Sequence, residues 1–119
     1  MRLFTITFDQ MNDTELAEQL TPAIDEAIEE VLKEYDEVYQ DGIRNTALHA
    51  VTMTMVSLYY YSYNVGGKLK NTILLEDSGY IDRILIIMRN TDKIKWKEVE
   101  YNGQKEKQQK SKCSSKSDD

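Results

Sequence analysis

His49 is the side chain of this sequence best suited to chemistry, because imidazole is the commonest general base in enzymes. It is the only histidine, so a zinc site of the HExxH kind cannot form, and neither a phosphate-binding loop nor a GxSxG motif occurs. At helical spacing His49 would share a face with Met53, Val56 and Tyr60. We therefore expect a histidine packed in the core or between helices, in a protein that is not an enzyme and needs no cofactor. Catalysis by His49 with a carboxylate brought near by folding is the alternative.

A cluster of tyrosines follows the histidine, and exposed aromatic rings can stack on the bases of single-stranded nucleic acid. Neighbouring residues on a helix point about 100° apart, so these rings would not form one platform. Tyrosine is also common at the boundary of a core and at protein interfaces. We expect packing or interface roles for the cluster, which consists of Tyr59, Tyr60, Tyr61 and Tyr63.

Acidic residues dominate the first part of the chain, and they suggest a charged contact surface. Residues 1–40 contain only two bases, Arg2 and Lys33, whereas bases outnumber acids in residues 41–119. A row of acidic side chains along a helix can simply be its solvated face, although like charges four residues apart repel slightly. It can also dock on a basic protein surface, where complementary charge speeds encounter and gives selectivity. We expect binding of a basic protein partner, in the manner of an inhibitor or accessory factor, by Asp25, Glu26, Glu29, Glu30, Glu34 and Glu37.

A smaller basic group lies near the end of the chain. Lys93, Lys95 and Lys97 alternate around Trp96, and more lysines follow in the terminal segment. Lysines on an edge strand also protect a sheet from edge-to-edge aggregation. The alternative function is a nucleic-acid-binding module that uses these four residues and the basic tail.

The start of the chain predicts a strand and an amphipathic helix, and this helix would position the acidic side chains. The segment "RLFTITF", residues 2–8, alternates apolar and less apolar positions and predicts a half-buried strand. From Asn12 or Asp13, which can cap a helix, apolar residues recur at spacings of three and four as far as Val38. Pro22 predicts a kink or a restart at Thr21, and the helix is expected to stop at Gly42.

The next segment, residues 45–67, contains no Asp, Glu, Lys or Arg. The stretch from Ile43 to about Tyr63 has a length that favours a second helix over a strand. We expect this helix to be central and buried, and "VGGK" to mark its end. A membrane span is not expected, because Asn, His, Thr, Ser and Tyr interrupt the apolar residues.

The following residues predict strands separated by turns. Two turn signals, at residues 77–79 and 90–92, divide β-branched and aromatic runs and predict a three-stranded antiparallel meander. The run "RILIIMR" suits its central strand and "KIKWKEVEY" an edge strand. A helix over "YIDRILIIMRN" is the main alternative.

The sequence as a whole predicts one α+β domain over residues 1–103, in which about four strands form one sheet with two packed helices on one face. A mostly helical protein with a short hairpin is the alternative. Residues 104–119 contain no large apolar residue and predict a flexible polar tail rich in Lys and Ser. The lone Cys113 excludes an internal disulfide, and we expect a cytoplasmic protein, in the host cytoplasm if it is encoded by a virus or plasmid. A homodimer is left open.

Overall fold

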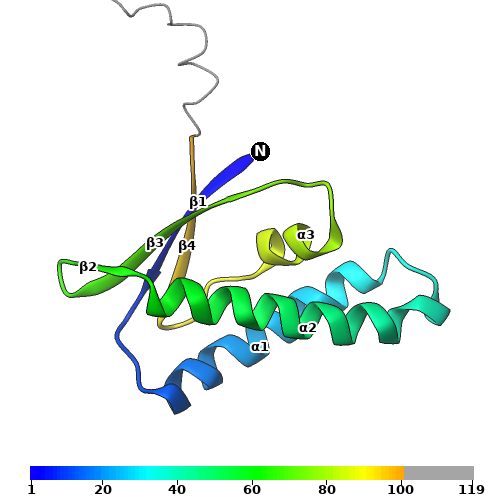
Figure 1. Cartoon of the computed structure of the whole chain (residues 1–119), viewed down its shortest axis with the longest axis horizontal. Helices are drawn as coiled ribbons and strands as arrows, with labels where there is room; N and C mark the ends of the chain where they lie inside the picture. The colour runs from blue at the N-terminus through cyan, green and yellow to red at the C-terminus, as the bar shows by residue number, and fades with distance from the viewer. Residues whose placement is uncertain (101–119) are drawn as a thin grey trace, which may run out of the picture.

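A four-stranded antiparallel sheet with three helices on one face makes up the protein (Figure 1). The structure is a computed structural model and describes residues 1–100. The predicted α+β fold class is confirmed, whereas the predicted domain end at residue 103 and the tail at 104–119 lie outside the described residues. The sheet order is β2-β3-β1-β4. In chain order the elements are β1 (Arg2–Phe8), α1 (Asp13–Leu32), α2 (Glu37–Tyr60), β2 (Tyr63–Val65), β3 (Lys68–Leu75), α3 (Tyr80–Ile87) and β4 (Ile94–Val99).

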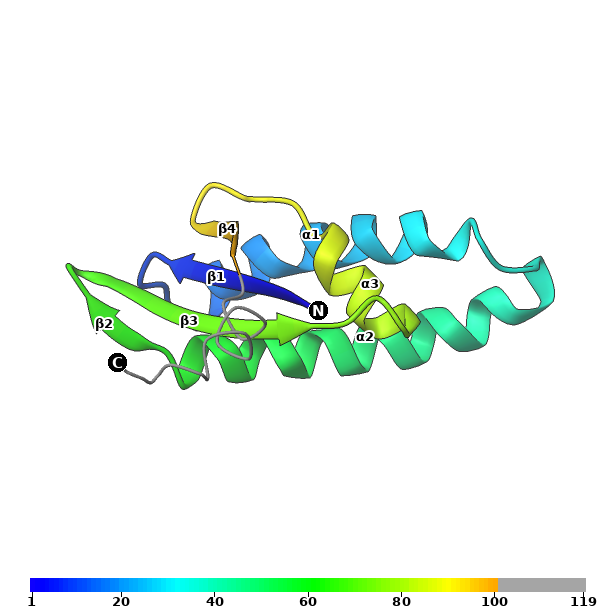
Figure 2. The same ribbon diagram turned by 90° about the horizontal axis from the view of Figure 1, so that it is seen from above.

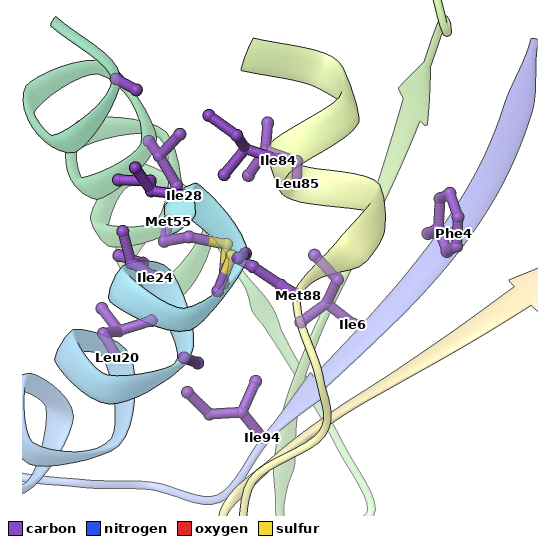
Figure 3. Packing of buried hydrophobic residues seen from close by; sticks show 14 of the residues in the cluster. Phe4, Ile6, Leu20, Ile24, Ile28, Met55, Ile84, Leu85, Met88 and Ile94 are labelled. Atoms are coloured by element: carbon purple, nitrogen blue, oxygen red, sulfur yellow. The ribbon is translucent and has the colours of Figure 1, made fainter. Parts of the chain in front are cut away.

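The first strand is confirmed, and it lies at the centre of the sheet. β1 pairs antiparallel with β3 on one side and with β4 on the other. Phe4, Ile6 and Phe8 are buried while the residues between them are half-buried, as the alternating pattern predicts. Side chains from β1, β4 and all three helices meet in one hydrophobic core between the sheet and the helices (Figure 3).

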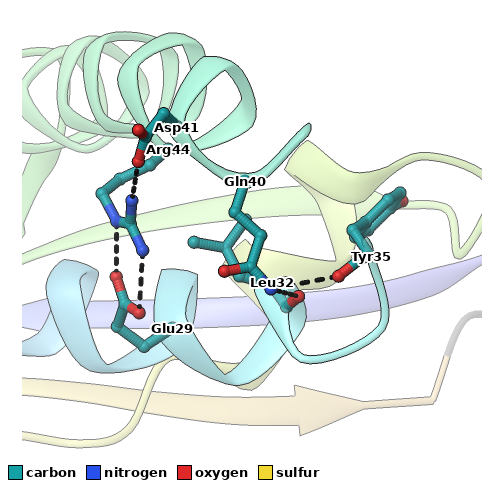
Figure 4. Close-up of polar contacts among 6 residues, drawn as sticks. All are labelled: Glu29, Leu32, Tyr35, Gln40, Asp41 and Arg44. Atoms are coloured by element: carbon teal, nitrogen blue, oxygen red, sulfur yellow. Dashed lines mark hydrogen bonds and ion pairs between the residues drawn. The ribbon is translucent and has the colours of Figure 1, made fainter. Parts of the chain in front are cut away.

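The two long helices are present, but the boundary between them differs from the prediction. Asn12 caps α1 in a capping box with Glu15, and the helix continues through Pro22. It ends at Leu32, and the amide of Gln40 donates hydrogen bonds of 3.0 Å to the carbonyl oxygens of Leu32, the last residue of the helix, and of Tyr35 in the following turn (Figure 4). α2 then begins at Glu37 and runs through the expected stop at Gly42, which is part of the helix.

The central strand expected at "RILIIMR" is wrong, since these residues belong largely to α3. The helical alternative for "YIDRILIIMRN" describes them correctly. Ile84, Leu85 and Met88 are buried, a spacing that places them on one side of a helix facing α1 and α2. A strand would have directed alternate residues of this run toward solvent.

The glycines of "VGGK" form a hairpin turn, so their prediction as a helix stop is wrong. α2 ends at Tyr60, and the short strand β2 then pairs with β3. Gly66 and Gly67 have φ angles of 60° and 82°, which suit a two-residue hairpin turn and favour glycine. The sheet still has four strands, because this hairpin adds β2 whereas the predicted central strand is the helix α3.

Candidate functional site

The predicted acidic residues lie on the outer side of α1, in the turn that follows it and at the start of α2. Ile24, Ile28 and Val31 are buried on the inner side of α1, which leaves the carboxylates in solvent. We call this set the acidic surface; its members, all exposed, are Asp25, Glu26, Glu29, Glu30, Glu34 and Glu37.

Cations from other elements pair with several carboxylates of the acidic surface. Arg44 of α2 donates hydrogen bonds of 2.8 and 3.2 Å to the two carboxylate oxygens of Glu29 (Figure 4). Arg83 of α3 pairs with Glu34, and Arg89 approaches Glu26 at 3.3 Å. These contacts offset the repulsion along α1 and tie it to its neighbours.

The charge of the acidic surface is only partly balanced by these contacts. The hydrogen bonds from Arg44 lower the pKa of Glu29, because they favour its ionised form. Glu30 pairs only with Lys33, the residue that caps the end of α1, at 3.4 Å. Among residues 1–100, Asp25 and Glu37 take part in no ion pair. The surface therefore keeps exposed negative charge.

The four residues of the alternative nucleic-acid site do not share one face. Trp96 is half-buried under the sheet, where its ring meets Phe4 edge to face at 5.7 Å. Lys93 donates a hydrogen bond of 2.6 Å to Glu15 at the start of α1. Lys95 and Lys97 are exposed on the opposite side of β4, away from the helices. Trp96 is thus not available for stacking on a base.

Lysines of the β2–β3 hairpin join Lys95 and Lys97 on the uncovered side of the sheet. Thr7 lies between Lys70 and Lys95 in neighbouring strands, and residues directly opposite one another in antiparallel strands point to the same side. The same register places Lys97 beside Thr5. We call this side the open sheet face; it carries the apolar residues Leu3, Val65, Leu74 and Val99 and the polar residues Thr5, Thr7, Tyr63, Lys68, Lys70, Thr72, Lys95 and Lys97.

Asp9 shows how closely the lysines gather at one end of the open sheet face. Lys68 donates a hydrogen bond of 2.5 Å to Asp9, which lowers the pKa of this carboxyl group. The charges of Lys93 and Lys95 lower it further. The sequence pattern does not predict that the lysines of β3 and β4 share one face, because it predicts a helix stop where the structure has the β2–β3 hairpin.

His49 is exposed near the middle of α2, so its prediction as a core or packing histidine is wrong. Within residues 1–100 no hydrogen bond or ion pair engages it, and no group of three or more His, Cys, Asp or Glu side chains could hold a metal ion. The geometry therefore brings no carboxylate to the imidazole.

The tyrosines have separate surroundings. Tyr59 is buried, and its hydroxyl exchanges two hydrogen bonds of 2.9 Å with the backbone of Met11. Tyr60 donates a hydrogen bond to Asp13, which raises the pKa of the tyrosine. Tyr61 and Tyr63 reach solvent, with exposed fractions of 84% and 56%.

No family model, curated protein or solved structure matches this chain. Over residues 1–100, each helix is too short or too polar to cross a lipid bilayer.

Proposed function

We propose that the chain is a small cytoplasmic protein-binding protein, an inhibitor or accessory factor, whose acidic surface docks on a basic surface of another protein. The observation that supports this proposal is the set of exposed carboxylates on α1 that exceeds the cations paired with it. Asp25 and Glu30 illustrate the excess, since Asp25 has no ion pair in the described part of the chain and Glu30 pairs only with Lys33, three residues further along.

The ion pairs of the acidic surface are compatible with docking. Exposed ion pairs contribute little to the stability of a fold, because water and salt screen them and long side chains lose freedom in forming them. Arg or Lys side chains of a partner can therefore join or replace Arg89 at Glu26 at small cost. Long-range attraction between the two surfaces speeds encounter and makes it dependent on salt.

A second candidate function, binding of nucleic acid, is favoured by one observation: Lys68, Lys70, Lys95 and Lys97 lie on one uncovered sheet face. Four cations on β3 and β4, the strands on either side of β1, suit a phosphate backbone, and neutralising phosphates releases counterions. Tyr63 is the exposed aromatic ring of this face.

One capture experiment separates the two functions. The tagged full chain is incubated with nuclease-treated and untreated lysate of its native host, and bound material is identified by mass spectrometry and nucleic-acid staining. Asp25→Asn with Glu30→Gln removes charge from the acidic surface without breaking a contact between helices. Lys95→Gln with Lys97→Gln does the same on the open sheet face, and Glu76→Gln with Asp92→Asn is the matched acidic control.

The leading proposal expects a basic protein that is retained after nuclease treatment. Its capture should fall several-fold with the Asp25/Glu30 double variant and stay unchanged with the control and the lysine variant. Capture that depends on Lys95 and Lys97 and disappears with nuclease would reject the leading proposal and support nucleic-acid binding.

A further inference from the structure

Three tyrosines line a hollow where the turn between α1 and α2, the first half of α2 and the start of α3 meet. The hollow has a volume of about 470 Å³, which is within the range of ligand sites in proteins. The rings of Tyr35 and Tyr80 meet edge to face at 6.4 Å, whereas the side chain of Tyr39 is 61% exposed. We call this place the tyrosine hollow; its lining consists of Tyr35, Tyr39, Gly42, Ile43, Thr46 and Tyr80.

The segments that form the tyrosine hollow are strongly acidic. Residues 34–46 and 76–83 together contain seven Asp or Glu and two Arg. Both arginines already pair with carboxylates of the fold. Within residues 1–100, the acids of these segments that have no ion pair are Asp36, Glu37, Glu76 and Asp82. The surroundings of the hollow therefore attract a positively charged ligand.

The helix ends near the tyrosine hollow do not reverse this preference. The N-termini of α2 and α3 carry partial positive charge, but each has a carboxylate in its first turn, Glu37 in α2 and Asp82 in α3. Lys68 and Lys70 lie in the β2–β3 hairpin, at the opposite end of the molecule from the turn between α1 and α2 (Figure 2). Negative charge therefore prevails around the tyrosine rings.

The aromatic lining favours a guanidinium group among cations. The face of a tyrosine ring attracts cations, and a planar, weakly hydrated guanidinium stacks on it, whereas an ammonium is strongly hydrated. The fold contains one such contact. The guanidinium of Arg83, whose charge is paired with Glu34, lies 5.8 Å from the centre of the Tyr35 ring and donates a hydrogen bond of 2.7 Å to its hydroxyl.

Two tyrosines of the hollow remain open to a second guanidinium. The hydroxyl groups of Tyr39 and Tyr80 make no hydrogen bond with any of residues 1–100. Each hydroxyl oxygen can accept a hydrogen bond from a guanidinium N–H, as the hydroxyl of Tyr35 does from Arg83. The hollow thus combines aromatic faces, free acceptors and negative surroundings.

Gly42 keeps the hollow open on the side of α2. Glycine inside a helix is less favourable than alanine. A Cβ atom added to Gly42 would meet nothing within 4 Å, so packing of the described chain does not require a glycine there. A larger side chain at this position would instead extend into the hollow that Gly42 lines. The glycine weakens the helix and leaves room for a ligand.

We propose that the tyrosine hollow receives an arginine side chain of the basic partner protein, an inference that rests on the proposed function. Glu34 and Glu37 of the acidic surface lie on either side of Tyr35 and Asp36 in the chain, so one partner contacts both the surface and the hollow. The acidic surface attracts the partner over a distance, and the hollow fixes its position. Arginine and tyrosine are enriched among the residues that contribute most to binding at protein interfaces.

Two peptides of equal charge test the hollow. Fluorescence anisotropy measures the affinity of the full chain for fluorescein-labelled hexa-arginine and hexa-lysine. The wild type should bind hexa-arginine about two- to fivefold more tightly, the contribution of a cation over an exposed aromatic ring. Tyr39→Leu removes the exposed ring and Gly42→Leu fills the hollow. Each should abolish the preference for hexa-arginine and leave the affinity for hexa-lysine nearly unchanged.

Each variant has a matched control away from the hollow. Tyr61→Leu removes a tyrosine that is 84% exposed at the other end of α2. Asn45→Leu adds a leucine at an exposed position of the same helix that does not line the hollow. Both controls should keep the preference for hexa-arginine. Circular dichroism verifies that the four variants are folded.

The outcomes distinguish this inference from the proposed function. Equal affinity of the wild type for the two peptides, no binding of either, or an unchanged preference in the hollow variants would overturn the inference. If only Asp25→Asn with Glu30→Gln weakens binding, the acidic surface binds cations and the hollow has no role. If Tyr39→Leu and Gly42→Leu abolish the preference while the Asp25/Glu30 variant binds as the wild type does, the hollow stands and the acidic surface is rejected.

Discussion

Tyr59 differs from the tyrosines that follow it in both burial and hydrogen bonding. Its hydroxyl accepts a hydrogen bond from the backbone N–H of Met11 and donates one to the backbone oxygen of the same residue, each 2.9 Å long. Its ring also meets Phe8 edge to face at 5.3 Å. One side chain of α2 therefore holds the segment that connects β1 to α1.

Removal of this hydroxyl should destabilise the protein measurably. Tyr59→Phe keeps the ring but leaves two backbone groups of Met11 without their partner, which should lower the free energy of unfolding by about 1–3 kcal/mol. Urea denaturation followed by the fluorescence of Trp96 measures the change. Tyr61→Phe is the matched control, because a side chain that is 84% exposed should give no change. Equal stability of the two variants would contradict the role of Tyr59.

At the scale of individual residues, the sequence predicted which side chains of α1 are exposed to solvent better than it predicted which residues pair with them. The acids of α1 had to face solvent because the apolar stripe takes the inner side of the helix, and they do. Their cations could not be foreseen, since Arg44 and Arg83 reach Glu29 and Glu34 only after α2 and α3 have packed on α1. His49 was misplaced because a lack of charge was read as burial.

At the scale of elements, two glycines that the sequence pattern predicts as helix stops have different backbone conformations. Gly42 lies inside α2, where alanine is the better residue, whereas Gly67 has a φ of 82° that disfavours any side chain. Gly42→Ala should therefore raise the free energy of unfolding by about 1 kcal/mol. Gly67→Ala should lower it by about 1–2 kcal/mol.

Urea denaturation measures both changes. The pair forms its own control, because the two substitutions are chemically identical. Changes of the same sign would show that one of the two glycines has been assigned to the wrong kind of element.

Sequence patterns predicted elements where one periodicity was clear and failed where two patterns fitted equally well. β1 alternates and α1 has helical spacing, and both are present. The run from Ile84 to Met88 is apolar at every position, so its pattern does not distinguish a strand from a helix, and packing against α1 decides between them. The hairpin glycines were ambiguous for the same reason, since a glycine pair can end a helix or turn a hairpin.

At the scale of the whole molecule, ion pairs join elements that are distant in sequence, and this makes stability depend on pH. Hydrogen bonds from the paired cations lower the pKa of each carboxyl group concerned. The pairs are Asp9 with Lys68, Glu15 with Lys93, Glu29 with Arg44, and Glu98 with Arg2.

The protein should lose stability in acid because of these groups. Their ionised form is favoured in the fold, so the unfolded chain takes up protons first as the pH falls. The stabilisation is present above the ordinary carboxyl values of about 4 and is lost as the pH falls through the lower values of the folded state. Urea midpoints between pH 7 and pH 2 measure the loss.

Glu29→Gln is the control for the acid effect. This variant should be less stable than the wild type at neutral pH and should lose less stability on acidification, because one of the linked groups is gone. A wild-type midpoint that is constant or rises below about pH 4 would contradict the explanation.

The central position of β1 determines when in its synthesis the chain can complete its sheet. Of the four described strands β1 is made earliest, yet both of its neighbours, β3 and β4, come after two long helices. Phe4, Ile6 and Phe8 therefore have no paired strand on either side until residue 68 and beyond have emerged, and β4 closes the second side last. The helical pair forms from local contacts and can assemble earlier, whereas the sheet depends on contacts of long sequence separation, which slow folding. For a growing chain, the apolar face of the first strand is the part that most needs protection from wrong associations.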